Sequence, residues 1–203
     1  MLAVISGCSG TGKNSVLREL MKLEPELVYS ISATTRRPRP GEVHGRDYFF
    51  LSEDEFRTAL AACEFLESAM VYGHYYGTPR RFIEEMTAKR KDVILDIDIA
   101  GALTVRAKRP DAILIFLLPP SIAELRKRLI ARHTDGVEEI EKRLAQADIE
   151  LGSLKSYDYV VVNKDIREAS KRIQAILAAE AYAVRRQDLD RLLRSLYKEE
   201  EAD

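Results

Sequence analysis

Cysteine is scarce in this sequence. Cys8 and Cys63 are the two cysteines among 203 residues, so the fold cannot rest on the disulfide framework that small secreted domains use. We expect both to be free thiols in a reducing compartment. The first residues show no basic segment followed by a secretory apolar core, and the cytoplasm is therefore the expected location.

An excess of charge of either sign is also absent. The chain has 32 Lys and Arg against 33 Asp and Glu, which gives a formal net charge of −1. Because an overall basic field would be needed to hold nucleic acid or an anionic membrane, we predict neither as a partner. The longest apolar stretch, Ala112 to Leu118, is far too short to span a bilayer. Any anion binding must therefore be local.

Hydrophobic residues make up 46% of the chain, which is enough to bury a substantial core. At this length the sequence suits one domain with a small insertion better than two independent domains. His44, His74 and His133 have no paired metal-ligand spacing, so we expect no zinc or iron site.

Short apolar runs rich in Val, Ile and Leu recur between helical patterns. Because their hydrophobicity is continuous rather than alternating, they predict strands covered on both faces, as in the parallel sheet of an α/β fold. The predicted strands are residues 2–6, 27–31, 93–97, 113–118 and 159–162. The predicted helices are residues 13–23, 101–108, 121–132, 137–154 and 166–179, with Ser121 as an N-cap.

Residues from about 32 to 90 break this rhythm, since they are richer in Arg, Gly, Tyr and Thr. Here residues 48–51 and 65–72 predict antiparallel strands around a helix at 53–62. We interpret 32–79 as an inserted substrate domain, with 1–31 and 80–180 as the core. Residues 181–203 predict a charged helical extension, and a solvated role is favoured for it over partner binding.

A glycine-rich turn joins the first predicted strand to the first predicted helix. Its sequence, GCSGTGKNS (7–15), fits the phosphate-loop pattern G-x-x-x-x-G-K. Glycines let the backbone turn its N–H groups inward, the helix N-terminus adds its positive dipole end, and Lys13 places a charge between the β- and γ-phosphates. A turn that binds nothing is the less favoured alternative. The predicted nucleotide-binding residues are Gly7, Cys8, Ser9, Gly10, Thr11, Gly12, Lys13, Asn14 and Ser15.

A second concentration of anion-binding side chains lies in residues 30–50. Arg36, Arg37 and Arg39 occur there together with Tyr48. Guanidinium groups bind phosphate oxygens in bidentate fashion, so this density suits one monophosphate. An exposed polyproline-like loop, or a segment that docks onto another protein, explains the Arg-Pro-Arg-Pro run equally well.

Further blocks follow in one order along the chain. They are EFLE (64–67), GHYYGTP (73–79), LDIDIAGA (95–102), an arginine-bearing stretch (128–143) and VVVNKD (160–165). With the phosphate loop and SATTRRPRPGEVHGRDYFF (32–50), they make the chain resemble guanylate kinases over about residues 2–179. The resemblance implies a P-loop nucleoside monophosphate kinase fold, with a mixed α+β GMP-binding insertion and a lid at about 128–143. It also implies ATP and GMP as substrates and Mg²⁺ as cofactor, in a monomer or a homodimer.

The resemblance assigns roles to matching residues. The implied GMP-binding residues are Ser32, Arg36, Arg39, Tyr48, Glu67, Tyr76, Thr78 and Asp96. The implied catalytic residues are Lys13, Arg36, Asp98, Arg132 and Arg143, while Arg128 and Asn163 join the ATP-binding set. Asn14 and Asp98 are the candidate Mg²⁺ ligands, mostly through water. Two positions depart from the usual pattern: Asn14 stands where Ser is common, and His133 where Gly is usual.

Base choice follows from hydrogen bonding at Glu67. Its carboxylate can accept from guanine N1–H and the 2-amino group, whereas AMP offers an acceptor at N1 and no 2-amino donor. Without the resemblance, a surface carboxylate at a strand end is the favoured interpretation of Glu67. Asp96 and Asp98 share one face of a strand end, where open α/β sheets bind ligands, and a capping pair is their alternative.

Two other functions stay open at this stage. One is a catalytically silent guanylate-kinase-like module that binds phosphorylated protein segments, against which the intact Gly12 and Lys13 argue. The other is a kinase of a related acceptor such as a ribosyl bisphosphate, against which Glu67 and Ser32 argue.

Overall fold

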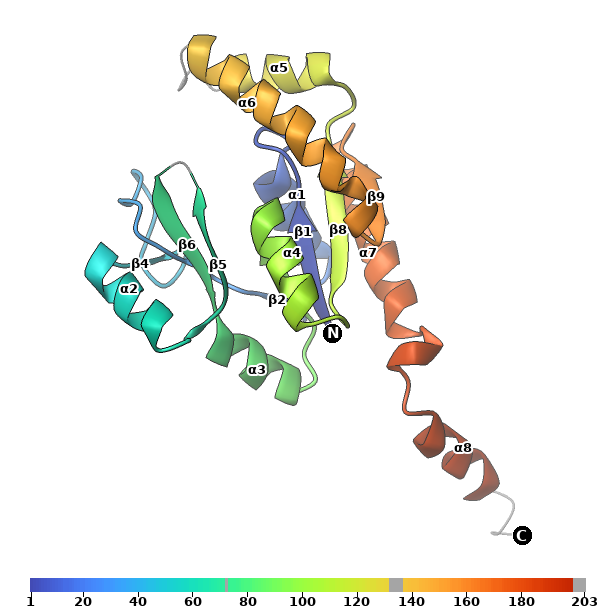
Figure 1. The fold of residues 1–203 in the computed structure, drawn as a ribbon. Coiled ribbons are helices and arrows are strands. Elements are labelled where there is room, and N and C mark those ends of the chain that lie inside the picture. Colours follow the sequence, from blue (N-terminus) through green and yellow to red (C-terminus); the bar gives the residue numbers. More distant parts are fainter. Residues whose placement is uncertain (72, 132–136, 199–203) are drawn as a thin grey trace.

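Two sheets, each with its own helices, make up the structure, a computed structural model that describes residues 1–71, 73–131 and 137–198 (Figure 1). The larger sheet has five parallel strands in the order β2-β7-β1-β8-β9. Its strands are β1 (Leu2–Ser6), β2 (Val28–Tyr29), β7 (Val93–Asp96), β8 (Ile113–Leu118) and β9 (Tyr159–Val162). The parallel α/β prediction is confirmed, although β2 is shorter than the predicted strand.

Helices cover both faces of this sheet, which is why its central strands are continuously apolar. On one face α1 (Lys13–Leu23) packs against α7 (Ile166–Ala181), and Leu20 and Ile173 join β1 and β8 in one buried cluster. On the other face, α3 (Arg80–Ala88) and α4 (Ile99–Lys108) contribute Ile83 and Val105 to a second cluster. The first turn of α1 is therefore fixed beside the carboxyl end of β1.

The helices after β8 begin and end close to the predicted positions. Ser121 caps α5 (Ile122–Ile130), because its hydroxyl accepts from the Glu124 amide, as predicted. Helix α6 (Val137–Leu151) gives way at Gly152 to a 3₁₀ turn, η1 (Gly152–Ser156), so the predicted helix to 154 is too long by about one turn.

The smaller sheet has the strand order β4-β3-β6-β5. It comprises β3 (Ala33–Thr34), β4 (Phe49–Phe50), β5 (Phe65–Val71) and β6 (His74–Pro79), with α2 (Glu53–Ala61) packed on it. Strands β5 and β6 are antiparallel, but β4 pairs with β3 in parallel, so the antiparallel prediction for residues 48–51 is wrong. The loop from 35 to 48 carries the chain back to the start of β3 before β4 begins. Strand β6 was not predicted, because Gly73, Gly77 and Pro79 give that stretch the composition of a loop. Helix α3, which follows it, was not predicted either.

The C-terminal segment is not one helix. Helix α7 continues to Ala181, a 3₁₀ turn η2 (Val184–Arg186) follows, and α8 (Leu189–Lys198) extends away from the body (Figure 1). Within the described ranges, no helix combines the length and the apolar character that crossing a bilayer requires. The predicted charged run at 199–201 lies outside the described residues.

Candidate active site

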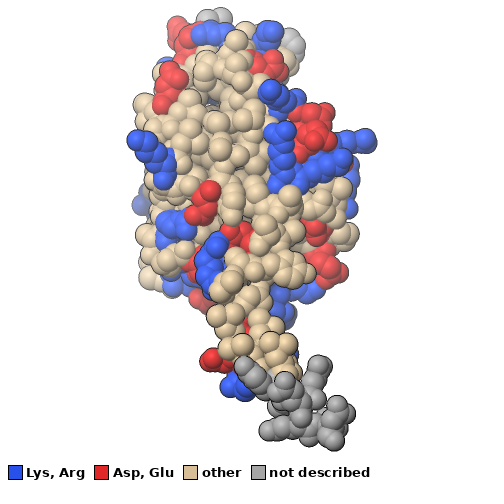
Figure 2. Space-filling model, turned by 90° about the vertical axis from the view of Figure 1, so that its right-hand side faces the viewer, with Lys and Arg blue, Asp and Glu red and all other residues tan. Residues whose placement is uncertain are grey.

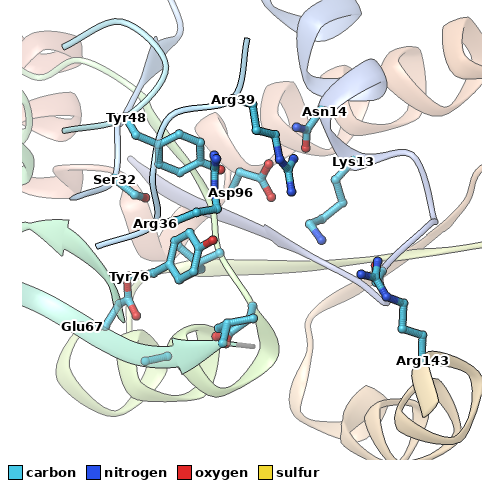
Figure 3. A pocket seen from close by; sticks show the side chains of 15 residues that line it. Lys13, Asn14, Ser32, Arg36, Arg39, Tyr48, Glu67, Tyr76, Asp96 and Arg143 are labelled. Atoms are coloured by element: carbon cyan, nitrogen blue, oxygen red, sulfur yellow. The ribbon is translucent and has the colours of Figure 1, made fainter. Parts of the chain in front are cut away.

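One open cavity lies between the phosphate loop, the smaller sheet and the carboxyl end of β7 (Figure 3). It collects residues that the sequence places far apart. Predicted site residues that line it are Ser9, Lys13, Asn14, Ser32, Arg36, Arg39, Tyr48, Glu67, Tyr76, Asp96, Asp98 and Arg143. We call this space the main cavity. Residues predicted for a triphosphate and residues predicted for a monophosphate therefore face the same opening.

The phosphate loop is shaped by glycine where other residues would not fit. A Cβ at Gly7 would approach the Leu117 carbonyl oxygen to 2.3 Å, and Gly12, the N-cap of α1, has φ of +90°. The Lys13 ammonium donates to the Gly7 carbonyl at 2.9 Å, so its stem folds back across the loop. A second cavity runs along residues 8–15 and is completed by Arg39 and Arg143. This second cavity, the anion cradle, shares five residues with the main cavity: Ser9, Lys13, Asn14, Arg39 and Arg143.

Asn163 and Arg128 brace the phosphate loop without lining the main cavity. The buried Asn163 amide donates to the Thr11 carbonyl at 2.7 Å. Arg128 donates to the same carbonyl at 3.3 Å and to the Asn163 carbonyl at 3.1 Å, and pairs with Glu124. Cys8, also predicted to bind ATP, is a buried free thiol against the Ala147 carbonyl of α6.

The arginine segment, residues 36–42, is held in place by an acidic residue that the sequence analysis did not single out. One Glu42 carboxylate oxygen pairs with Arg36 Nη2 at 2.9 Å, and the other accepts from the Arg39 amide at 2.7 Å. Arg36 also donates to the Arg37 carbonyl, and its guanidinium lies 5.3 Å from the centre of the Tyr48 ring. The Arg36 pairing holds the pKa of Glu42 below its ordinary value, so it stays ionised near neutrality.

Glu42 was detectable in principle, since it follows two residues after Pro40 in an arginine-rich turn with no other nearby acid before Asp47. A single carboxylate among several guanidinium groups indicates a structural counter-charge. What the sequence could not show is that both Arg36 and the Arg39 backbone contact it.

Two tyrosines complete the wall of the main cavity around the arginine segment. Tyr48 and Tyr76 meet edge to face with their centroids 6.1 Å apart. Burial, with Asp96 nearby, raises the pKa of Tyr48 to about 12, so its hydroxyl remains a hydrogen-bond donor at neutral pH. The neighbouring Tyr75 stacks on Phe56 and does not line the main cavity.

Glu67 is only 3% exposed, so the alternative that it is a surface carboxylate is wrong. The Thr78 hydroxyl donates to it at 2.5 Å, which joins two residues predicted to read the base. Burial, and secondarily the Asp98 charge, raise the pKa of Glu67 to about 7 despite the Thr78 bond. Helix α4 approaches it so closely that a Cβ at Gly101 would lie 2.6 Å from its carboxylate. A side chain at position 101 would therefore require the Glu67 carboxylate to shift.

Asp96 and Asp98 have separate structural positions. Asp96 is the last residue of β7 and is half-buried, and burial raises its pKa even though Lys13 lowers it. Asp98 caps α4, because its carboxylate accepts from the Gly101 amide at 2.7 Å, so the capping alternative is correct for this residue. Asp98 nevertheless lines the main cavity with Lys13 and Asn14.

The donor chemistry here fits Mg²⁺ that is held mainly by water and phosphate. An Asn14 amide oxygen and the Asp98 carboxylate are hard oxygen ligands. Among the described residues no group of three or more Asp, Glu, His or Cys side chains forms a protein cage for an ion. Mg²⁺ usually keeps several waters and binds through one or two protein ligands plus substrate phosphates.

Arg143 reaches the site from α6. Its Nη1 donates to the Ser9 hydroxyl of the phosphate loop at 3.2 Å, and its side chain points into the main cavity (Figure 3). Arg132 and His133 lie outside the described residues, as does part of the predicted lid.

Comparisons with known proteins agree with one another. The family model described as Guanylate kinase matches residues 1–180. A guanylate kinase of Caldanaerobacter subterraneus is 49% identical over 186 residues, which cover 92% of this chain and 90% of that protein. One from Clostridium perfringens is 45% identical over 201 residues, covering 99% and 91%. The crystal structure of guanylate kinase from Anaplasma phagocytophilum superposes with a TM-score of 0.82 at 35% identity, covering 97% of this chain and 95% of that one.

Proposed function

The chain belongs to the guanylate kinase family, and we propose that its main cavity is where the γ-phosphoryl group of ATP passes to GMP, giving ADP and GDP. One observation supports placing the reaction in the main cavity. The phosphate loop and the arginine segment open into the same cavity, with Lys13 from the first and Arg39 from the second both lining it. Two anions that repel each other in water can be held there face to face.

The donor binds along the phosphate loop. Its inward N–H groups and Lys13 neutralise the ATP phosphates, and Arg143 adds charge from α6. Asn163 and Arg128 keep the loop rigid through the Thr11 carbonyl. Arg132 is a further proposed contributor of charge. Asn14 and Asp98 would hold Mg²⁺, mostly through water, and the ion would neutralise charge on the ATP phosphates.

The acceptor binds on the smaller sheet. Arg36 and Arg39, with the Tyr48 and Tyr76 hydroxyls, hold the GMP phosphate. Glu67 reads guanine N1–H and the 2-amino group. Ser32, Thr78 and Asp96 complete the proposed base-binding set. Because the deoxyribose of dGMP leaves these contacts intact, dGMP is also a proposed acceptor.

Phosphoryl transfer then needs alignment more than acid–base help. An oxygen of the GMP phosphate attacks the γ-phosphorus, the bond to the bridging oxygen breaks, and its electron pair stays with the β-phosphate of ADP. The attacking oxygen is already largely ionised near pH 7, so no general base is required. We assign closure over the reactants to residues 32–79 and 128–143, which exclude water from the transferring group.

An acceptor screen tests this function. ADP release is followed in a coupled assay with GMP, dGMP, AMP, CMP and UMP offered in turn. We expect turnover with GMP and strong rejection of AMP, because AMP would leave the buried Glu67 carboxylate without a donor. Equal turnover of AMP would refute the account of base recognition.

A further inference from the structure

Helix α4 ends in a lysine that ties the helix to the smaller sheet. Charges of both signs are interspersed on the face shown in Figure 2, and surface lysines such as Lys22 and Lys171 pair with carboxylates. Lys108 instead donates from its ammonium to the Leu66 carbonyl of β5 at 2.6 Å. This bond joins segments 42 residues apart in the sequence. It reaches β5 one residue before Glu67, which is proposed to read the base.

The carbonyl that accepts this bond belongs to a residue without a partner in β6. Phe65 is paired with Pro79 in the ladder. The next pair joins Glu67 to Thr78, so two steps along β5 match one step along β6. Leu66 is therefore the extra residue of a β-bulge. Bulges bend a strand, are frequent beside active sites and re-aim the side chains next to them.

The bulge lets two consecutive residues of β5 face the same helix. In a regular strand, successive side chains point to opposite faces of the sheet. Here the Leu66 side chain is 6% exposed and shares a buried cluster with Ala102 and Val105 of α4. The Glu67 carboxylate lies close against Gly101 of that helix. The bond from the last turn of α4 then fixes the backbone between these two side chains.

The charge of Lys108 acts in the same direction as its hydrogen bond. Burial raises the pKa of Glu67 to about 7, and the Asp98 charge raises it as well, whereas the Thr78 hydrogen bonds and the Lys108 charge lower it. A nearby cation therefore favours the ionised carboxylate, which is the form that accepts from both guanine donors.

We propose that Lys108 is a positioning residue for recognition of guanine: it holds the bulge at Leu66 so that the Glu67 carboxylate meets the N1–H and the 2-amino group together. The inference rests on the proposed function, in which Glu67 reads the base of GMP. Lys108 does not line the main cavity, so it acts through the backbone of β5. One carboxylate accepts from two adjacent donors in a narrow range of orientations, and a small displacement weakens both bonds.

The alternative is that Lys108 only stabilises α4. Cations in the last turn of a helix interact favourably with its dipole, and Arg106 lies in the same turn. Arg106 donates to the Pro110 carbonyl and pairs with Asp158. Arg106→Met is therefore the matched control, because it removes a cation from this turn and leaves the bond to Leu66 in place.

The test compares GMP with inosine monophosphate, which keeps the N1–H and lacks the 2-amino group. Calorimetry without ATP gives Kd for each nucleotide, and the coupled assay gives kcat and KM. In Lys108→Met we expect Kd for GMP to rise about three- to tenfold and Kd for inosine monophosphate to rise less, so the preference for GMP narrows. KM for ATP and kcat at saturating GMP should not change. Lys108→Arg, which keeps a cationic donor, should restore most of the affinity for GMP.

The control separates positioning from stability. Arg106→Met should lower Tm at least as much as Lys108→Met does, because it loses an ion pair, and should keep the wild-type preference for GMP. An unchanged preference in Lys108→Met overturns the proposal. So does an equal narrowing in Arg106→Met, or a Lys108→Arg variant as weak as Lys108→Met. Absence of GMP turnover in the wild-type chain, measured in the same assay, would instead refute the proposed function.

Discussion

The phosphate loop and the arginine segment both prepare a site for phosphate, but they are built from different parts of the chain. The phosphate loop relies on backbone N–H groups, whose direction is set by Gly7 and Gly12 and by the start of α1. The arginine segment relies on long, flexible side chains. Other side chains must hold them before their guanidinium groups are oriented toward a phosphate. Glu42 and the Tyr48 ring do this for Arg36. A substitution in the phosphate loop should therefore act by removing charge directly. A substitution in the arginine segment should act largely by changing how the arginine side chains are positioned.

The largest effect is expected for Lys13→Met. The change keeps the length of the side chain but removes the charge between the phosphates, so kcat should fall about 10²–10³-fold. Folding should be preserved, because the ammonium makes one hydrogen bond, to the Gly7 carbonyl. Steady-state kinetics and thermal unfolding measure both. Lys22→Met, on the exposed side of the same helix, is the matched control and should be neutral. Near-full turnover in Lys13→Met would remove this lysine from the mechanism.

Glu67→Gln should have the next largest effect, and it should fall on GMP alone. A glutamine offers an oxygen but also an N–H₂ group, so it cannot accept from both guanine donors. Hydrogen bonds to charged groups contribute about 1.5–3 kcal/mol, which corresponds to roughly a 10- to 100-fold loss in kcat/KM for GMP. KM for ATP should not change. An unaltered kcat/KM for GMP would show that the carboxylate does not read the base.

The pH dependence of GMP use should sharpen this assignment. With the pKa of Glu67 at about 7, about a tenth of the carboxyl is ionised at pH 6 and about nine tenths at pH 8. Because only the ionised form accepts both donors, KM for GMP should fall roughly ninefold over this range. Glu67→Gln isolates the effect, since it keeps the titration of the GMP phosphate and loses that of the carboxyl. Identical profiles for the two proteins would contradict the assignment.

The same raised pKa has a consequence for stability. The folded state holds a proton on Glu67 more tightly than the unfolded state, whose carboxyl has an ordinary pKa of 4.5. The contribution of Glu67 to the free energy of unfolding is therefore highest below pH 4.5 and falls as pH rises toward about 7. The free energy of unfolding, measured with urea between pH 4.5 and 7, should show this fall in the wild-type chain. Glu67→Gln should lack the part of it that Glu67 contributes.

The sequence predicted local features well and distant ones less well. Strands β1 and β8, helix α1 and the phosphate loop all have the predicted limits, because each depends on neighbouring residues. The direction of β4 was wrong, since its partner β3 is reached only after a loop of more than a dozen residues. The burial of Glu67 depends on how α4 meets β5. That contact passes through Gly101 and leaves no local signature in the sequence.

The arginine segment shows the same limit within the site. Arg36 and Arg39 were found from their residue type, but the carboxylate that holds them was not, because its role follows from a folded-back turn. Glu42→Gln tests that role and should have the smallest effect of these changes. It retains an oxygen for the Arg39 amide and weakens the Arg36 pair, so KM for GMP should rise about three- to tenfold, with KM for ATP unchanged.

The sign of the Glu42→Gln effect separates two roles for this carboxylate. If it positions Arg36, its loss frees a rotamer-rich side chain that GMP must then order, and affinity falls. If it competes with the GMP phosphate for the guanidinium, its loss raises affinity and KM for GMP decreases. A restored KM in Glu42→Asp, which keeps the charge on a shorter stem, would add support for positioning. A lower KM for GMP in Glu42→Gln would instead mean that the GMP phosphate must displace Glu42 from Arg36. The arginine segment would then be less preorganised for phosphate than the phosphate loop is.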